Sequence, residues 1–304
     1  MGSPQFAVPS LEKLNDNPSI TIELVISQED KVRNRNKLVP TDVKKKAIEL
    51  GLETYEPKSV NSRQALDKIH SIKPDFIVVI AFGQLIGDEL LNTYKDRIIN
   101  IHSSLLPKYR GAAPMQAAIL NGDRETGVCS MLIEKKMDTG DILACEKMEI
   151  GKDTTIVDVH DTLSQKASNL IVDTILNFDN YYNNRKKQDD LSATYSKKID
   201  KSMGKIDFHE SGLTIDLKVR AFQNWPSTFV TLNDENVKIH KVSIIDKYNE
   251  AMIGEIIKVD DTGIYVNCKD SCVVIEEVQF PNKKRMKVSD FIRGNHIEVG
   301  SLFS

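Results

Sequence analysis

The apolar run Asp75–Ala81, DFIVVIA, most strongly constrains the fold of this chain. A strand with water on one side alternates polar and apolar residues, whereas this run directs apolar side chains toward both faces. Strands of this kind occur where helices cover both sides of a parallel sheet. The preceding segment Ser62–Lys73 has helical periodicity and is followed by Pro74, which ends a helix. The run therefore predicts an α/β domain.

Strand-like and helix-like segments alternate over the first two-thirds of the chain. Strands are expected at Thr21–Ser27, Asp75–Ala81, Arg97–His102, Val128–Ile133 and Ile142–Ile150. Helices are expected at Thr41–Leu50, Ser62–Lys73, Ala112–Asn121 and Thr154–Phe178. This order predicts an open, mostly parallel, Rossmann-like sheet with helices on both faces.

The character of the chain changes after the last of these helices. Residues 181–202 are mostly polar and are expected to form a linker. One helix at Ser211–Phe222 is then followed by short β segments separated by turn residues, which predicts a small antiparallel barrel. We expect an α/β domain over residues 1–180 and a β domain over residues 203–304.

Composition excludes several classes of protein. The formal net charge of −3 gives no overall basic signature, so a nucleic-acid partner would need a local basic patch. No stretch approaches the roughly 20 apolar residues of a membrane helix, and the amino terminus lacks signal-peptide features. Of the four cysteines, Cys268 and Cys272 lack the two further ligands that a metal site needs. We expect a cytoplasmic monomer without a metal, whose cysteines are buried and reduced.

The amino-terminal segment Met1–Pro4 reads like the turn that follows a first strand, although no apolar strand precedes it. The alternative is that the fold begins with a helix at Pro9. We expect that a central strand is missing here. Two neighbouring strands would then have unpaired edges with a void between them, at a cost in stability.

Asn100 and His102 stand two residues apart at the end of the predicted strand Arg97–His102. Side chains alternate along a strand, so both project to one face at the carboxyl end, where open α/β sheets bind ligands. An amide and an imidazolium aimed at one point can both donate hydrogen bonds to an oxyanion. A lone strand-end histidine is more often structural, and the paired Asn100 favours a functional site.

Asp138 lies in the turn Lys136–Ile142, between two β segments, and is a candidate partner for His102. A carboxylate beside an imidazole favours the charged ring. An Asx-turn explains an Asp before Thr-Gly equally well, and spacing alone does not decide between the two. No Ser or Cys is evidently paired as a nucleophile. These residues therefore suggest acid-assisted transfer, in which an external nucleophile attacks a carbonyl and forms a tetrahedral intermediate.

The stretch Asn100–Pro114, NIHSSLLPKYRGAAP, resembles the signature of the 10-formyltetrahydrofolate-dependent formyltransferases. In that family an Asn-x-His pair and a later Asp form the catalytic set, and Asp138 follows His102 here by the family's 36 residues. The resemblance implies catalytic roles for Asn100, His102 and Asp138. It also implies that the C-terminal β domain is an OB-like barrel that contacts tRNA.

Other segments resemble the branch of the family that formylates initiator methionyl-tRNA in translation initiation. They are MGSPQFAVPSL, QEDKVRNRNKLVPTDVK, MDTGDIL, ATYSKKIDKSMGKIDF, RAFQNWPSTF and KKRMKVSDFIRG. The nearest alternative is a formyltransferase for an amino-sugar nucleotide. A glycinamide ribonucleotide enzyme, a formyltetrahydrofolate hydrolase and a non-catalytic RNA-binding protein are further alternatives.

The resemblance also implies two sets of binding residues. Contacts to the co-substrate 10-formyltetrahydrofolate are expected from Phe82, Gly83, Gln84, Leu85, Ile86, Ser104, Leu105, Leu106 and Pro107. Contacts to the acceptor end of the tRNA are expected from Arg33, Arg35 and Lys37. In the branch of the family that formylates methionyl-tRNA, an Arg of this loop is functionally important, and Arg35 is the nearest match. Without the resemblance, this basic stretch would equally suit a solvated charge run.

Overall fold

The computed structural model describes residues 1–33, 37–247 and 251–303, with residues 31–33 and 37 described by their backbone alone. Its helices are α1 (Val8–Asn15), α2 (Asp42–Glu49), α3 (Arg63–Ile72), α4 (Asp88–Thr93), α5 (Pro114–Leu120), α6 (Ile156–Leu176), α7 (Phe178–Asn183), α8 (Gly212–Ala221) and α9 (Val288–Phe291). Its strands are β1 (Val25–Ile26), β2 (Lys31–Arg33), β3 (Lys37–Val39), β4 (Thr54–Tyr55), β5 (Ile77–Val79), β6 (Ile98–His102), β7 (Arg110–Gly111), β8 (Glu125–Leu132), β9 (Ile142–Glu149), β10 (Tyr195–Ser196), β11 (Thr228–Leu232), β12 (Glu235–Ile245), β13 (Ile256–Val259), β14 (Ile264–Asn267), β15 (Cys272–Gln279) and β16 (Met286–Lys287).

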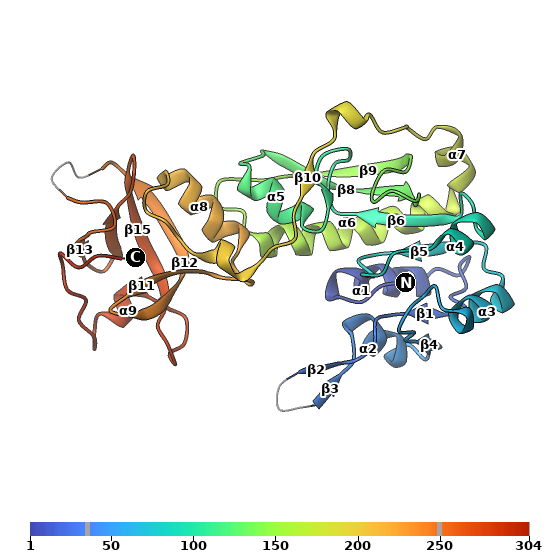
Figure 1. The fold of residues 1–304 in the computed structure, drawn as a ribbon, viewed down its shortest axis with the longest axis horizontal. Coiled ribbons are helices and arrows are strands. Elements are labelled where there is room, and N and C mark those ends of the chain that lie inside the picture. Colours follow the sequence, from blue (N-terminus) through green and yellow to red (C-terminus); the bar gives the residue numbers. More distant parts are fainter. Residues whose placement is uncertain (34–36, 248–250, 304) are drawn as a thin grey trace. The chain divides into compact units, whose positions relative to one another are not determined.

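The chain divides into two compact units (Figure 1). The first consists of Met1–Pro114, Glu125–Glu149 and His160–Ser196. The second consists of Met115–Arg124, Ile150–Val159 and Lys197–Ser304. Each unit has its own strands and its own buried core, so the two are described in turn.

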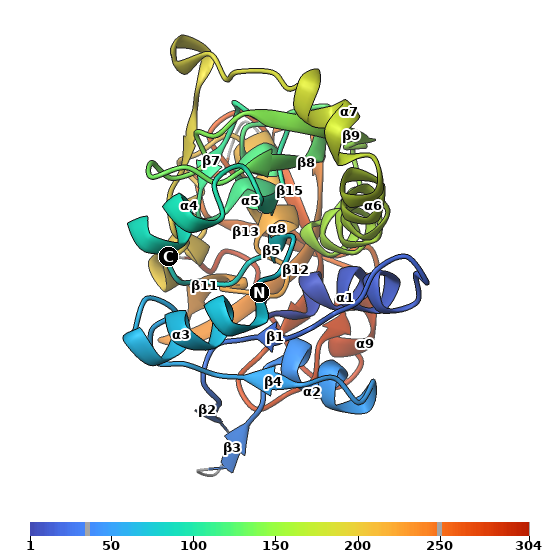
Figure 2. The ribbon, with the colours of Figure 1, turned by 90° about the vertical axis from the view of Figure 1, so that its right-hand side faces the viewer.

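The first unit has the expected alternation of strands and helices. β1 pairs with β4 and β5 with β6, in both cases in parallel, while β8 and β9 continue the second sheet in antiparallel fashion. Ile98, Ile99 and Ile101 of β6 are all buried, which fits a strand covered on both faces. The helix α6 lies beside this sheet (Figure 2), where Thr174 donates a hydrogen bond to Ser130 of β8 (2.9 Å).

Between β1 and β5, two of the described residues, Met1 and Gly2, make backbone hydrogen bonds to both strands or the residues that follow them. The Met1 ammonium donates to the Val78 carbonyl (2.6 Å), and the Met1 carbonyl accepts from the Ile80 N–H (2.9 Å). On the other side, the Gly2 N–H donates to the carbonyl of Ile26 (3.0 Å). Next to this bridge is a cavity of about 850 Å³, whose lining includes both strands. We call this cavity between the two strands the gap.

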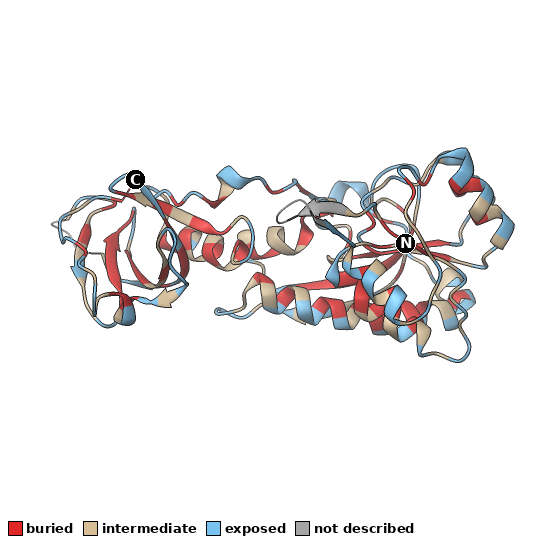
Figure 3. Cartoon of the chain, turned by 90° about the horizontal axis from the view of Figure 1, so that it is seen from below, coloured by how far each residue is buried: buried red, intermediate tan, exposed pale blue. Residues whose placement is uncertain are grey.

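The second unit is built on an antiparallel sheet of six strands, in the order β11-β12-β15-β14-β13, with β16 also paired to β15. Its inward residues form one apolar core, visible as the buried positions around the C-terminal label in Figure 3. The helix α8 contributes Ile215 and Val219 to that core. Among the described strands no pairing joins β13 to β11, so the predicted closed barrel is not confirmed.

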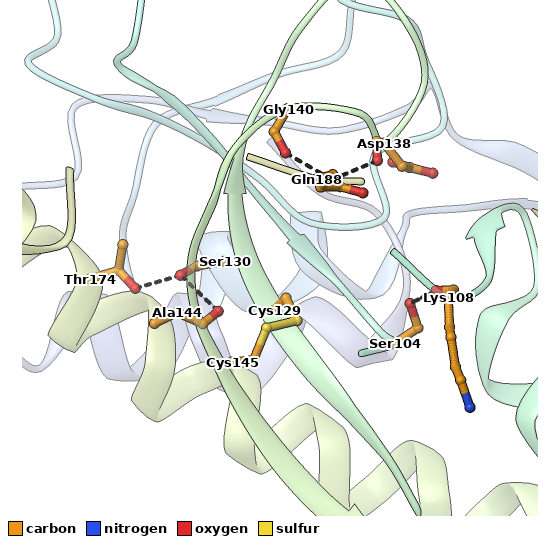
Figure 4. Close-up of a disulfide and its surroundings, with 10 residues drawn as sticks. All are labelled: Ser104, Lys108, Cys129, Ser130, Asp138, Gly140, Ala144, Cys145, Thr174 and Gln188. Carbon is orange, nitrogen blue, oxygen red and sulfur yellow. Dashed lines mark hydrogen bonds between the residues drawn. A yellow bond between two sulfur atoms is a disulfide. The ribbon is translucent and has the colours of Figure 1, made fainter. Parts of the chain in front are cut away.

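Cys129 and Cys145 form a disulfide between β8 and β9 (Figure 4), so the prediction of four reduced cysteines is wrong. The two residues are direct partners in the strand register, and their Cα atoms are 4.1 Å apart. That pairing depends on the register of two strands, which 16 residues of sequence separation do not reveal. Cys268 and Cys272 are free and buried, as predicted.

The segment expected to be a linker, residues 181–202, has local structure of its own. It contains the end of α7, short 3-10 turns at Asp190–Ser192 and Lys201–Gly204, and the strand β10. β10 pairs in parallel with β7, which lies just after the strand that bears Asn100 and His102. This part of the expected linker is therefore paired with the loop that follows Asn100 and His102.

Candidate active site

The strand β6 delivers Asn100 and His102 to the carboxyl edge of the sheet, as predicted. β5 runs parallel to it with Val79 opposite Asn100, so the turn after β5 begins at the level of His102. The pleat places Asn100 and His102 on one face, while Ile99 and Ile101 are buried on the other. Local strand geometry alone thus brings the amide and the imidazole together.

His102 is nearly buried, with 6% of its surface exposed. Its Nε2 lies 3.0 Å from the carbonyl oxygen of Tyr109. Because a carbonyl oxygen only accepts hydrogen bonds, Nε2 must carry a hydrogen. Nδ1 is then the ring nitrogen that faces the site, and it lies 3.7 Å from Oδ1 of Asp138. That distance exceeds a hydrogen bond and corresponds to a looser contact between ring and carboxylate.

Asp138 is held by a partner far away in the sequence. Its Oδ2 accepts a hydrogen bond from the N–H of Gly111 (2.8 Å), which leaves Oδ1 directed toward His102. The residue adopts a left-handed backbone conformation with φ of 55°. This long-range contact favours a role in the site over a purely local Asx-turn.

Gly111 has to be a glycine in this arrangement. Its φ of 114° lies in a region that other residues rarely adopt, and a Cβ there would come within 2.5 Å of the Ser196 carbonyl oxygen. The close approach arises because β7 pairs with β10, where the Ala112 N–H donates to that same carbonyl (3.2 Å). The glycine therefore lets the segment around Ser196 pack onto the catalytic loop while its own N–H reaches Asp138.

Two side chains of the site, Arg110 and Gln188, were not singled out from the sequence. Gln188 accepts a hydrogen bond from Nε of Arg110 (3.0 Å) and donates to the carbonyls of Asp138 (2.9 Å) and Gly140 (2.8 Å). Arg110 is 1% exposed and forms an ion pair with Asp190 at 2.8 Å. Burial lowers the pKa of Arg110, but its bonds to Asp190 and Tyr195 outweigh that effect and leave the pKa above its usual value. The guanidinium therefore stays charged.

The first predicted folate segment, Phe82–Ile86, forms the turn after β5. The side chain of Phe82 is buried in the core of the first unit, and its carbonyl accepts from Nε2 of Gln28 (3.0 Å). Gly83 has a φ of 81° and is exposed, and Leu85 is 71% exposed. Gln84 is half-buried and binds the Val60 N–H through Oε1 (2.7 Å), while Ile86 packs at the edge of the core. The turn thus presents Gly83 and Leu85 outward.

The second predicted folate segment, Ser104–Pro107, follows β6 directly. Ser104 is buried and donates to the carbonyl of Lys108 (2.6 Å), which closes the loop on itself. Leu105 and Leu106 pack against Cys129 and Met131 of β8, so the loop is anchored on the sheet beside the disulfide. Both predicted folate segments accordingly leave the sheet at the edge where β5 and β6 end.

Two of the three predicted tRNA contacts, Arg33 and Lys37, lie on the hairpin of β2 and β3. Arg33 ends β2 and Lys37 begins β3, and the two residues pair in the hairpin register. Arg35 lies outside the described residues. Within the described ranges, no three His, Cys, Asp or Glu side chains are grouped so that they could hold a metal ion. None of the described helices is both long and apolar enough to cross a membrane.

An amide, an imidazole and a carboxylate at the edge of an α/β sheet form a site suited to acyl-type transfer, and comparison with known proteins agrees. Residues 1–175 match the family described as formyl transferase, and residues 198–296 match the formyl transferase C-terminal domain. The chain belongs to the formyl transferase family.

Similar proteins match over nearly the whole chain. The methionyl-tRNA formyltransferase of Finegoldia magna is 46% identical over 299 residues, covering 98% of this chain and 96% of that protein. That of Sulfurihydrogenibium sp. is 40% identical over 305 residues, covering 99% and 98%. The structure of WlaRD, a sugar 3N-formyl transferase solved in the presence of dTDP and 5-N-formyl-THF, has a TM-score of 0.67 at 24% identity, covering 93% of this chain and 97% of that one. This last likeness concerns the fold alone.

Proposed function

We propose that the edge formed by Asn100, His102 and Asp138 transfers the formyl group of 10-formyltetrahydrofolate to the amine of initiator methionyl-tRNA. The full-length identity to methionyl-tRNA formyltransferases supports this choice of substrate. The single observation that supports the chemistry is the approach of His102 Nδ1 to Asp138 at 3.7 Å, on the face of the sheet that also bears Asn100.

The reaction needs no covalent enzyme intermediate. The unprotonated amine attacks the formyl carbon, a C–N bond forms, and negative charge collects on the formyl oxygen. The Asn100 amide and the Nδ1–H of His102 donate hydrogen bonds to that oxygen, each worth about 3 kcal/mol in a desolvated site. The bond from the formyl carbon to the folate nitrogen then breaks, and this nitrogen takes the proton lost by the amine. Asp138 holds the imidazole and relays that proton through water.

The binding partners follow from the same proposal. The turn Phe82–Ile86 and the loop Ser104–Pro107 bind the folate, since both leave the sheet beside His102. The basic loop with Arg33, Arg35 and Lys37 contacts the acceptor end of the tRNA. The β domain at 203–304, which we propose to be OB-like, supplies a second tRNA surface. We expect the enzyme to act as a monomer in the cytoplasm, where initiator tRNA is used, with residues 1–180 as the catalytic domain.

A substrate comparison tests this proposal. The enzyme is incubated with 10-formyltetrahydrofolate and, in separate reactions, with initiator methionyl-tRNA, elongator methionyl-tRNA, an amino-sugar nucleotide and glycinamide ribonucleotide. We expect efficient formylation of initiator methionyl-tRNA and little or none of the others. Preferential formylation of the sugar nucleotide would overturn the assignment of substrate while leaving the family intact.

A further inference from the structure

The side-chain amide of Gln188 makes three hydrogen bonds, which use both of its N–H donors and its oxygen. Its Oε1 accepts from Arg110. Its Nε2 donates to the carbonyls of Asp138 and Gly140, and Figure 4 shows these two bonds. The residue is 7% exposed, so water is a poor substitute for these partners. A buried amide with this set of bonds fixes the distance between the groups it joins.

The orientation of the Gln188 amide is set by the donors and acceptors around it. Arg110 donates only, so the atom of Gln188 that faces it must be the oxygen. The two carbonyls accept only, so the atom that faces them must be the nitrogen. The flipped amide would place like groups against each other at both ends. Arg110 itself is buried and paired with Asp190, and therefore holds the oxygen end in place.

The backbone at Asp138, which Gln188 contacts through Nε2, has a conformation that needs support from neighbouring groups. Asp138 has a positive φ of 55°, which is unfavourable for a residue with a side chain and persists only where neighbouring groups hold it. Gln188 binds the carbonyl of Asp138 itself and that of Gly140 two residues later. The direction of the Asp138 carboxylate toward His102 depends on this backbone.

Three consecutive residues complete the connection to His102. The carbonyl of Tyr109 accepts a hydrogen bond from His102 Nε2. The side chain of Arg110 donates to Gln188, and the N–H of Gly111 donates to Asp138. The hydrogen bonds therefore form a closed ring through the catalytic loop, Gln188 and the Asp138 turn. A shift of Gln188 moves the carboxylate relative to the imidazole.

We propose that Gln188 is a positioning residue for formyl transfer, which holds the Asp138 turn so that the carboxylate meets the His102 ring. The inference rests on the proposed roles of Asp138 and His102. It assigns no contact with either substrate to Gln188, so its loss acts on turnover and not on substrate binding.

Two substitutions at Gln188 remove different parts of the ring. Gln188→Leu keeps a similar side-chain volume and removes all three hydrogen bonds of the amide. Gln188→Glu keeps the contact with Arg110 but cannot donate to the two carbonyls while its carboxylate is charged. Protonation at lower pH restores one donor, so the activity of Gln188→Glu relative to wild type should rise as the pH falls. A merely structural role does not produce that pH profile.

The experiment measures kcat, both KM values and the melting temperature of the full chain. Thr174→Val is the matched control, because it removes a buried hydrogen bond to Ser130 in the same unit without any link to Asp138. We expect both Gln188 variants to lose kcat on the order of 10–100-fold with little change in either KM. Thr174→Val should lower the melting temperature and keep kcat.

Asp138→Asn separates this inference from the proposed function. If Asp138→Asn turns over normally, the catalytic assignment itself fails. If it loses turnover while Gln188→Leu and Gln188→Glu keep theirs, only the role of Gln188 is overturned. If the inference holds, Gln188→Leu adds little further loss in the Asp138→Asn background, because both changes disable the same contact. Independent, multiplying losses would contradict it.

Discussion

Two regions of the same unit differ sharply in how completely they are held. At the end of β6, His102 is hydrogen-bonded to the loop that follows it, and Asp138 and Gln188 have hydrogen-bond partners from distant parts of the chain. Between β1 and β5, the described residues Met1 and Gly2 provide the backbone hydrogen bonds, and a cavity of about 850 Å³ lies beside them. The region at the end of β6 is fixed by several mutually dependent hydrogen bonds, whereas the region between β1 and β5 is incompletely packed.

The difference separates the demands of chemistry from those of stability. Transfer requires donors placed within a fraction of an ångström of the developing oxyanion, and a ring of buried hydrogen bonds supplies that accuracy. The gap lies between the β1-β4 pair and β5, and lost packing there lowers the free energy of unfolding without removing a hydrogen bond of the ring. Changes in the gap should therefore alter stability and leave kcat unchanged, whereas changes in the ring should alter kcat.

The largest effect expected in the gap is a pH dependence of stability. Burial lowers the pKa of the Met1 ammonium from 8.0 to about 5. Between these values the unfolded chain binds more protons than the folded chain, so the free energy of unfolding rises with pH from about 5 to about 8. The full difference corresponds to at most about 4 kcal/mol. Urea unfolding at several pH values measures it, with kcat followed in parallel as the control.

A smaller effect is expected from filling the gap. An extension of five or six apolar, β-branched residues before Met1 can pair with β1 and β5 and bury its side chains in the cavity. After the entropy cost of ordering it, we expect a gain of about 2 kcal/mol and a rise in melting temperature of about 4–8 °C.

The matched control for this extension has the same length but contains proline and aspartate, which a central strand does not accept. The extension also converts the Met1 amine into an amide, so the pH dependence described above should disappear in both variants. Equal melting temperatures for the two extended proteins and the original would contradict the account of the gap. A change in kcat would contradict the separation of the two regions.

Local chemistry made much of the fold predictable. Helices α2, α3 and α8 begin where Thr41, Ser62 and Ser211 were expected to start them, and each of these side chains accepts a hydrogen bond from the first turn. The pairing of Asn100 with His102 also follows from strand alternation alone. In each case the deciding residues are neighbours in sequence.

The features that were not predicted depend on segments that come into contact only in the folded chain. The Cys129–Cys145 disulfide requires the register of β8 against β9, and Gln188 requires that residues 188–196 return to the catalytic loop. Residues 181–202 are polar with few apolar residues, so their sequence does not indicate that they pack against the catalytic loop. The approach of Asp138 to His102 was expected through the family resemblance, because spacing in the sequence left an Asx-turn equally open.

The central claim is that His102, with Asn100 and Asp138, stabilises the oxyanion formed during transfer. The most direct test is the single-turnover rate of formylation by His102→Ala, measured beside the equilibrium affinity for the folate. The account predicts a rate lower by on the order of 10²–10³-fold with nearly unchanged folate affinity. Turnover close to that of the wild-type enzyme would contradict it.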